Sequence, residues 1–214
     1  MFASNGKESN AMRVLPIKSE EATPWILKKH YAKRLPSISY AFGLYEESDL
    51  IGIVTFGMPA SNALCEGVCG VENKHLVIEL NRLCLQDNTK NQASFLVSNA
   101  IKLLPKPMVI VSYADTAQGH VGYVYQATNF MFTGTTKERT DMDAGEGKHS
   151  RHGTDPSIRK FRSAKHRYIF IHGNKYQKKK LKDALRYKEE PYPKGEIRRY
   201  DAGTRVITQQ LLFG

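Results

Sequence analysis

The stretch Met108–Tyr113 (MVIVSY) constrains the fold more than any other part of the chain, because it is almost uniformly apolar. A strand with apolar side chains on both faces is typical of the centre of a sheet that is covered on both sides. The preceding stretch Phe95–Leu104 (FLVSNAIKLL) has helical apolar spacing and ends before Pro105. His75–Leu85 (HLVIELNRLCL) reads as a strand before that helix. This order predicts a sheet with helices on both faces.

Further strands are expected on either side of this unit. Ser39–Leu44 and Leu50–Gly57 are β-rich runs separated by the acidic turn EESD, which predicts an antiparallel hairpin. A helix is predicted at Glu21–Tyr31, with Thr23 as cap and Pro24 as its first residue. The fold class is therefore α/β, with a mixed, mainly antiparallel central sheet.

The second half of the chain continues the alternation. A short helix at Gly122–Asn129 and a strand from Phe130 to Thr133 come next, and a strand at His166–Gly173 follows a long polar loop. Along the strand at His75–Leu85, alternation predicts that Glu79 and Arg82 do not both face the core.

Charge is distributed unevenly along the 214 residues. Residues 1–136 hold 12 Lys and Arg against 11 Asp and Glu, whereas residues 137–200 hold 19 against 9. The overall net charge of +11 therefore belongs almost wholly to the C-terminal part and predicts an anionic partner. We expect a disordered arm or a cloning remnant at residues 1–11, a catalytic domain at 12–174 and a basic extension at 175–214, which packs on the domain or contacts DNA.

Aromatic residues are interleaved with the basic residues of the extension. Tyr176, Tyr187, Tyr192 and Tyr200 can stack on bases or cover the core. DNA, RNA and acidic membranes all stay open as the anionic partner, and we expect nucleic-acid contacts from two sets of basic residues, one after the first helix and one in the extension: Lys33, Arg34, Lys178, Lys179, Lys180, Arg198 and Arg199.

Several site and compartment classes are disfavoured. Three sparse cysteines argue against a disulfide framework, and no apolar run is long enough to span a membrane. We therefore expect a cytoplasmic protein. The loop Thr140–Asp155 carries His149 and His152, which could bind a metal with Asp141 or Asp143, but polar loops commonly have this composition and no metal is predicted.

The strand at Met108–Tyr113 ends in polar residues. Ser112, Tyr113 and Asp115 lie at its carboxyl end, where ligands bind in sheets that contain parallel strands. Asp115 is either a catalytic base or the cap of the following helix, and the two roles are compatible. His120 is a weaker candidate, because a lone histidine at a helix start is often a surface residue.

The order of elements resembles the GCN5-related N-acetyltransferase-like superfamily. The resemblance rests on the polar turn QDNTKNQAS before the Phe95 helix and on Tyr125 ahead of Asn129-Phe130. It implies that acetyl-CoA is held near Arg82, Leu83, Asn91, Gln92, Ala93 and Ser94. It also implies that Tyr125 protonates a departing thiolate. The turn lacks the usual glycine pair, and Asn129 stands where glycine is common.

A closer resemblance covers roughly residues 24–200. HYAKRLPSISYAFGLYE, VTFGMPAS, ELNRLCL, VSYADTAQGHVGYVYQATNF and KHRYIFI, in this order, are similar to the phage Mom-type DNA modification proteins. The resemblance implies carbamoylmethylation of the exocyclic amine of adenine in double-stranded DNA, with a small-molecule donor, which protects phage DNA from restriction. The catalytic candidates under this interpretation are Asp115, Tyr125, Ser112, His30 and Tyr31.

Two other functions stay open from the sequence. One is an acetyl-CoA-dependent acyltransferase acting on a protein or small amine, which has no need of the basic extension. The other is a non-catalytic DNA-binding protein, in which Tyr125 and Asp115 have no chemical role.

Overall fold

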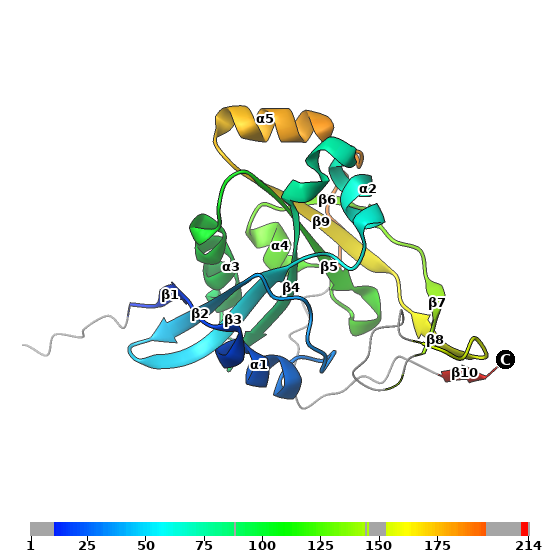
Figure 1. Cartoon of the computed structure of the whole chain (residues 1–214). Coiled ribbons are helices and arrows are strands. Elements are labelled where there is room, and N and C mark those ends of the chain that lie inside the picture. Colours follow the sequence, from blue (N-terminus) through cyan, green and yellow to red (C-terminus); the bar gives the residue numbers. More distant parts are fainter. Residues whose placement is uncertain (1–10, 88, 144, 146–152, 196–210, 214) are drawn as a thin grey trace, which may run out of the picture.

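The computed structural model describes residues 11–87, 89–143, 145, 153–195 and 211–213. In this part of the chain the main sheet has seven strands in the order β1-β2-β3-β4-β5-β9-β6 (Figure 1). β4 and β5 are parallel, and the other neighbouring strands are antiparallel. The predicted mixed, mainly antiparallel sheet is confirmed. The strands are β1 Arg13–Pro16, β2 Tyr40–Glu46, β3 Asp49–Gly57, β4 Val77–Leu85, β5 Met108–Asp115, β6 Met131–Thr135 and β9 Lys165–His172.

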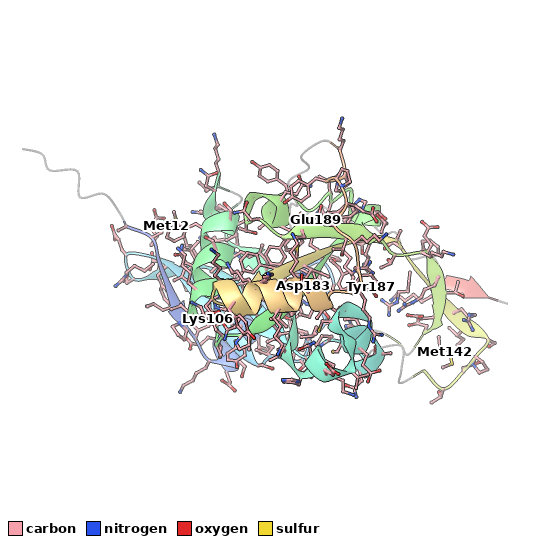
Figure 2. The ribbon with its side chains drawn as sticks, turned by 90° about the horizontal axis from the view of Figure 1, so that it is seen from above. Met12, Lys106, Met142, Asp183, Tyr187 and Glu189 are labelled. Carbon is pink, nitrogen blue, oxygen red and sulfur yellow. The ribbon has the colours of Figure 1, made fainter. Side chains whose placement is uncertain are left out.

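Helices cover both faces of this sheet, as the apolar central strand predicted. The helices are α1 Ser19–Lys28, α2 Asn62–Asn73, α3 Gln92–Leu103, α4 Tyr123–Ala127 and α5 Lys175–Ala184, with short 3-10 helices η1 Lys74–Leu76 and η2 Thr116–Gln118. Apolar residues of α3 and α4 pack on one face, which contains Ile110 and Ala114 of β5. Residues of α2 and α5 pack on the other face, against Val109 and Val111. The view from above separates these layers (Figure 2).

A second, three-stranded sheet projects from the main one among the described residues. It has the order β10-β8-β7, with β7 Arg139–Met142, β8 Ile158–Arg162 and β10 Leu211–Phe213 (Figures 1 and 2). The sequence predicted only a long polar loop between β6 and β9. Asp141 forms one ion pair with Arg139 of the same strand and another with Arg162 of β8, and the second pair joins the two strands of the hairpin. His149 and His152 lie outside the described residues.

The first helix begins earlier than predicted. α1 starts at Ser19, and Pro24 lies inside it and is not its first residue. The backbone amide of Lys18 donates to Oε1 of Glu21 at 2.9 Å, and Thr23 Oγ1 donates to the carbonyl of Ser19. The start is therefore stabilised by a glutamate in the first turn, and Thr23 is not the cap.

The C-terminal segment packs on the domain. Leu181 of α5 is buried. Beyond the helix, the amide of Arg186 donates to the carbonyl of Val68 at 3.0 Å, and the amide of Glu190 donates to that of Phe132 at 2.8 Å. We call residues 185–195 the strap, because they satisfy backbone acceptors of α2 and of the edge strand β6. Arg198 and Arg199 lie outside the described residues.

Candidate functional site

The parallel strands β4 and β5 separate toward their carboxyl ends. Their ladder pairs Val77 with Val109, Ile78 with Ile110 and Glu79 with Val111, and it stops there although both strands continue. We call the region between residues 80–85 of β4 and 112–115 of β5 the splay. Ser112 Oγ donates to the carbonyl of Leu80 at 2.9 Å across its narrow end. Ligands of sheets with parallel strands bind beyond such carboxyl ends, so the splay is the candidate active site.

A β-bulge at Asn81 shapes the β4 side of the splay. Thr55 of β3 is paired with Arg82 and Phe56 with Leu80, so Asn81 is the extra residue. The bulge brings Arg82 to the same face as Glu79, the face covered by α1, α2 and α5. The prediction that these two side chains do not both face inward is wrong, because simple alternation fails at a bulge.

Glu79 is the residue of this site that the sequence analysis did not select. Its carboxyl group is only partly exposed, and burial raises its pKa to about 7, against the opposing charges of Arg82, Arg34 and Lys165. The guanidinium group of Arg82 donates to backbone carbonyls. The ion pairs of the described residues do not include one between Arg82 and Glu79. A carboxyl group with this pKa can accept a proton near neutral pH. The signal was a glutamate between two apolar residues, Ile78 and Leu80, in a strand.

Arg82 organises the loop that follows α1. We call residues 29–39 the rim loop. Arg82 is 8% exposed, and its Nε and Nη2 donate to the carbonyl of Arg34 at 3.3 and 2.8 Å. Its Nη1 donates to the carbonyl of Asn81 at 2.6 Å. Most of its donors are therefore engaged by the protein itself, so that Arg82 fixes the rim loop beside the splay.

The rim loop places an aromatic row at the site. The rings of His30 and Tyr31 are stacked with centroids 4.4 Å apart, and the ring of His120 meets Tyr31 edge-on at 6.3 Å. Burial, together with the charges of Arg82 and His120, lowers the pKa of His30 to about 3. Nδ1 of His30 accepts from the amide of Ala32 at 3.1 Å, as a neutral ring does. This row can stack on a planar base.

Asp115 is held by several donors. It is 6% exposed and accepts from the amide of Ala117 at 3.1 Å, which makes it the cap of η2. Its carboxylate also accepts from Ser163 Oγ and pairs with Lys165 Nζ. The predicted capping role is confirmed, while the role as base stays a prediction. Burial lowers the pKa of His120, and the negative charge of Asp115 opposes that effect.

Tyr125 reaches the splay from the α3 and α4 face. Its ring centroid lies 5.4 Å from that of Phe130 and 5.2 Å from that of Tyr168. Its hydroxyl group shares a hydrogen bond with the side chain of Ser112. Burial raises the pKa of its hydroxyl, so the phenol is protonated at neutral pH. Tyr123, by contrast, is 54% exposed. Of the two tyrosines of α4, Tyr125 is therefore the one that lies at the candidate site.

The start of α4 depends on a glycine. Gly122 has φ of +76°, and a Cβ there would lie 2.3 Å from the ring of Tyr168. Only glycine permits both this backbone conformation and this approach. Tyr168 donates to the carbonyl of Val121, which fixes the segment that carries Tyr125.

The predicted catalytic residues thus approach the splay from two faces. Ser112 and Tyr125 lie on the α3 and α4 face, whereas Tyr113 and Asp115 alternate to the face of Glu79 and Val111. The charge of Glu79 contributes to the raised pKa of Tyr125, so the two groups are within electrostatic range across the sheet. The candidate site therefore has a carboxyl group on one face of the sheet and a phenol on the other face.

The predicted cofactor-binding turn leads into α3. Asn91 is the residue before the helix, with φ of 69° and no capping hydrogen bond from its side chain. Gln92, Ala93 and Ser94 form the first turn, in which amides have no acceptor within the helix. α3 follows the carboxyl end of β4, so this turn lies at the same end of the sheet as the splay. Leu83 is partly buried, and its side chain packs against the core on the α3 and α4 face.

The predicted DNA-binding residues lie at two ends of the sheet. Lys33 and Arg34 belong to the rim loop at the splay. Lys178, Lys179 and Lys180 are exposed on α5. Because β9 pairs Met108 with His172 and Asp115 with Lys165, α5 starts at the end of β5 away from Asp115.

The described residues contain no group of three or more His, Cys, Asp or Glu side chains that could hold a metal ion. No helix among them is long and apolar enough to cross a membrane.

Comparison with known proteins identifies the family. Residues 11–194 match the model of the Mom protein family. The chain is 32% identical over 212 residues to methylcarbamoylase mom of Escherichia phage Mu, covering 88% of this chain and 86% of the relative. Among solved structures, the fold is similar to yncA, a putative acetyltransferase of Salmonella typhimurium solved with acetyl-CoA (TM-score 0.47, 11% identity, 77% of this chain and 96% of that one). A probable acetyltransferase of Staphylococcus epidermidis gives a TM-score of 0.48 at 8% identity, over 75% of this chain and 99% of that one. The family match spans both strands of the splay and the rim loop, and the chain belongs to the Mom protein family.

Proposed function

We propose that this protein is a phage or prophage transferase that modifies the exocyclic amine of adenine in double-stranded DNA. The observation that carries the proposal is that Glu79 and Tyr125 lie on opposite faces of the sheet beside the splay and within electrostatic range of each other, with His30 and Tyr31 in the adjoining rim loop, in a chain of the Mom family. The relative in phage Mu is a methylcarbamoylase, which is consistent with transfer of a carbamoylmethyl group.

The two groups suit the chemistry of an aromatic amine. Its lone pair is delocalised into the ring, so the nitrogen needs to lose a proton as it forms its bond to the donor carbon. Glu79, whose pKa is about 7, accepts that proton in our proposal. Tyr125, whose hydroxyl is protonated, donates a proton to the departing group. The amine thus gains one bond to carbon and loses one to hydrogen.

Asp115 takes a positioning role in this proposal. The sequence allowed it as a base or as a helix cap, and its carboxylate already accepts from Ala117, Ser163 and Lys165. Lys165 in turn lowers the pKa of Glu79 through its charge. Asp115 therefore acts by holding Lys165 within reach of the base, and Ser112 acts by orienting Tyr125.

The target base has to leave the DNA stack to reach the splay. Enzymes that modify a base in a duplex extrude it and bind it between aromatic or apolar side chains. His30, Tyr31 and His120 provide such rings on the α1 side of the site. His30 is uncharged at neutral pH, so stacking on it does not require a protonated ring.

The first turn of α3 suits the anionic end of a small-molecule donor. Helix N-termini attract phosphate through free amides and the helix dipole, and Asn91–Ser94 place such a terminus at the same end of the sheet as the splay. These residues would suit the pyrophosphate of acetyl-CoA, but the acetyl group of that thioester lacks the amide nitrogen of a carbamoylmethyl group, so transfer of a carbamoylmethyl group requires a donor that carries this nitrogen.

Nucleoside analysis tests the proposal. DNA is isolated from cells that express the full-length protein and from cells with an empty vector, digested to nucleosides and analysed by mass spectrometry. We expect a deoxyadenosine of increased mass only with the protein, together with resistance of the DNA to restriction enzymes whose sites contain adenine. Deoxyadenosine of unchanged mass, in cells that contain the folded protein, would overturn the proposal.

A further inference from the structure

The rim loop presents an apolar side chain to solvent. Leu35 is 47% exposed, and it belongs to the rim loop that also carries His30 and Tyr31. The residues before it are Lys33 and Arg34, and Pro36 follows it. A single exposed leucine is common on protein surfaces and needs no explanation by itself. Its meaning here comes from how the loop around it is held.

The backbone is anchored on both sides of Leu35. On one side the carbonyl of Arg34 accepts from Nε and Nη2 of Arg82. On the other side the carbonyl of Ser37 accepts from Nδ2 of Asn81 at 2.8 Å. Both donors belong to the bulged part of β4, which forms one wall of the splay. Leu35 is therefore held at a fixed place relative to the site.

The close approach of Ser37 to the sheet strengthens this anchor. A Cβ on Gly57 would lie 1.8 Å from the carbonyl oxygen of Ser37, so that only glycine permits the loop to lie this close to β3. The amide of Ser39 also donates to the carbonyl of Phe56 at 2.8 Å. Pro36 restricts the backbone between the two anchors. The loop is built to hold its tip rigidly.

An anchored apolar side chain next to two cationic residues is suited to a base stack from which one base has been extruded. When a base leaves a duplex, an apolar gap remains between neighbouring base pairs, flanked by phosphates. We propose that Leu35 is a wedge that enters this gap and keeps the target adenine extruded into the splay, while Lys33 and Arg34 contact the adjacent phosphates. This inference rests on the proposed function and adds the element by which the enzyme opens double-stranded DNA.

Other exposed apolar residues lack these features and serve as controls. Leu103 is 50% exposed at the end of α3. The amino end of β5, which follows α3 in the chain, is the end away from the splay. Leu103→Ala therefore removes a similar exposed leucine without touching the rim loop.

The test uses purified full-length protein and short duplexes that carry adenine in every flanking context. One set is fully paired, and a second set has a pyrene nucleotide opposite the adenine, which fills the vacated space in the stack by itself. We expect Leu35→Ala to bind the paired duplexes about tenfold more weakly than the unchanged protein, because alanine does not fill the space that the extruded adenine leaves in the stack. On the pyrene duplexes the difference should shrink to within about twofold. Leu35→Met should restore binding to paired DNA, and Leu103→Ala should match the unchanged protein throughout.

Two outcomes would overturn the wedge. One is equal binding of Leu35→Ala and the unchanged protein to paired DNA. The other is an equal loss on paired and pyrene duplexes, which would show a general contact. A failure of the proposed function is separate, because it would appear as normal deoxyadenosine in DNA from cells with the unchanged protein. Thermal unfolding of each variant shows whether it is folded.

Discussion

The carboxyl group of Glu79 lies on β4 between Ile78 and Leu80, both of which are buried. Burial of a charged carboxylate at such a position costs free energy, and the pKa of Glu79 is therefore raised to about 7. Nearby cations limit this rise, so that the group titrates near neutral pH and is not held neutral throughout. This balance is what a general base requires.

The first prediction follows from this balance. The rate of modification by the unchanged protein should rise as pH increases through about 7, because Glu79 then becomes a carboxylate. Glu79→Gln should lower the rate by about a hundredfold or more and lose this rise. The measurement is the initial rate of deoxyadenosine modification as a function of pH. A variant with the original rate and pH profile would remove Glu79 from the reaction.

The same residue predicts a pH dependence of stability. Its pKa is raised in the folded state, from 4.5 to about 7, so folding favours the protonated form. The stabilisation is fully present below 4.5 and is lost as pH rises through about 7. Denaturant unfolding should show this loss in the unchanged protein. Glu79→Gln should lack it, and an identical pH dependence in both proteins would contradict the burial of this carboxyl group.

Tyr125 provides a test on the other face of the sheet. Tyr125→Phe keeps the ring that packs against Phe130 and Tyr168 but removes the hydroxyl. We expect nearly unchanged thermal stability and DNA binding, with turnover reduced by about a hundredfold. Tyr123→Phe is the control, because Tyr123 is exposed on the same helix. Equal turnover of the two variants would mean that Tyr125 only packs.

At the scale of elements, the sequence predicted the parts whose pattern is local. The apolar run of β5, the hairpin of β2 and β3, and α3 before Pro105 all agree with the structure to within a few residues. The bulge at Asn81 has no local pattern, because it is defined by the register of β4 against β3. The positions of Glu79 and Arg82 therefore could not be predicted from alternation.

Other elements were missed for similar reasons. β7 and β8 are short and polar, and they are stabilised by pairing with each other and by the ion pairs of Asp141. α2 was not predicted from the sequence; it contains Cys65 and Cys69, which are both buried free thiols. Candidate residues that are near one another in the sequence, such as Ser112 and Asp115, could be selected from it, whereas Glu79 became a candidate only from the three-dimensional arrangement.

The basic helix α5 carries the next prediction. Replacing Lys178, Lys179 and Lys180 together by Gln should weaken duplex binding uniformly and make it less dependent on salt. The logarithmic slope of affinity against salt should fall by about 0.9 for each phosphate that is no longer neutralised. These residues are exposed, so folding should be retained. Because α5 starts at the end of β5 away from the splay, turnover on bound DNA should change little. An unchanged salt dependence would remove α5 from the DNA interface.

At the scale of the whole molecule, the basic C-terminal part has two physical roles. The exposed lysines of α5 face solvent, while the partly buried Leu185 and Tyr187 of the strap pack against the core. The guanidinium carbon of Arg167 lies 3.3 Å from the ring centroid of Tyr187, which is labelled in Figure 2. The hydroxyl of Tyr192 donates to the carbonyl of Phe130 at 2.9 Å. These two tyrosines therefore cover the sheet, which was one of the two roles that the sequence allowed.

Truncation after Ala184 tests the role of the strap. It should lower thermal stability strongly, because it exposes the edge of β6 and removes the hydrogen bonds from Arg186 and Glu190. Tyr192→Phe is the milder variant and should cost about 1 kcal/mol in the free energy of unfolding, since it deletes one hydrogen bond. A truncated protein as stable as the full chain would show that the strap contributes nothing to the fold.

The position of the added group on the base tests the central claim most directly. DNA from cells that express the unchanged protein is digested, and the deoxyadenosine of increased mass is fragmented in a tandem mass spectrometer. The account predicts that the added group stays with the exocyclic amine nitrogen, and that the double variant Glu79→Gln, Tyr125→Phe yields unmodified deoxyadenosine. An added group on a ring nitrogen or on another base, or full modification by the double variant, would contradict a reaction at the splay.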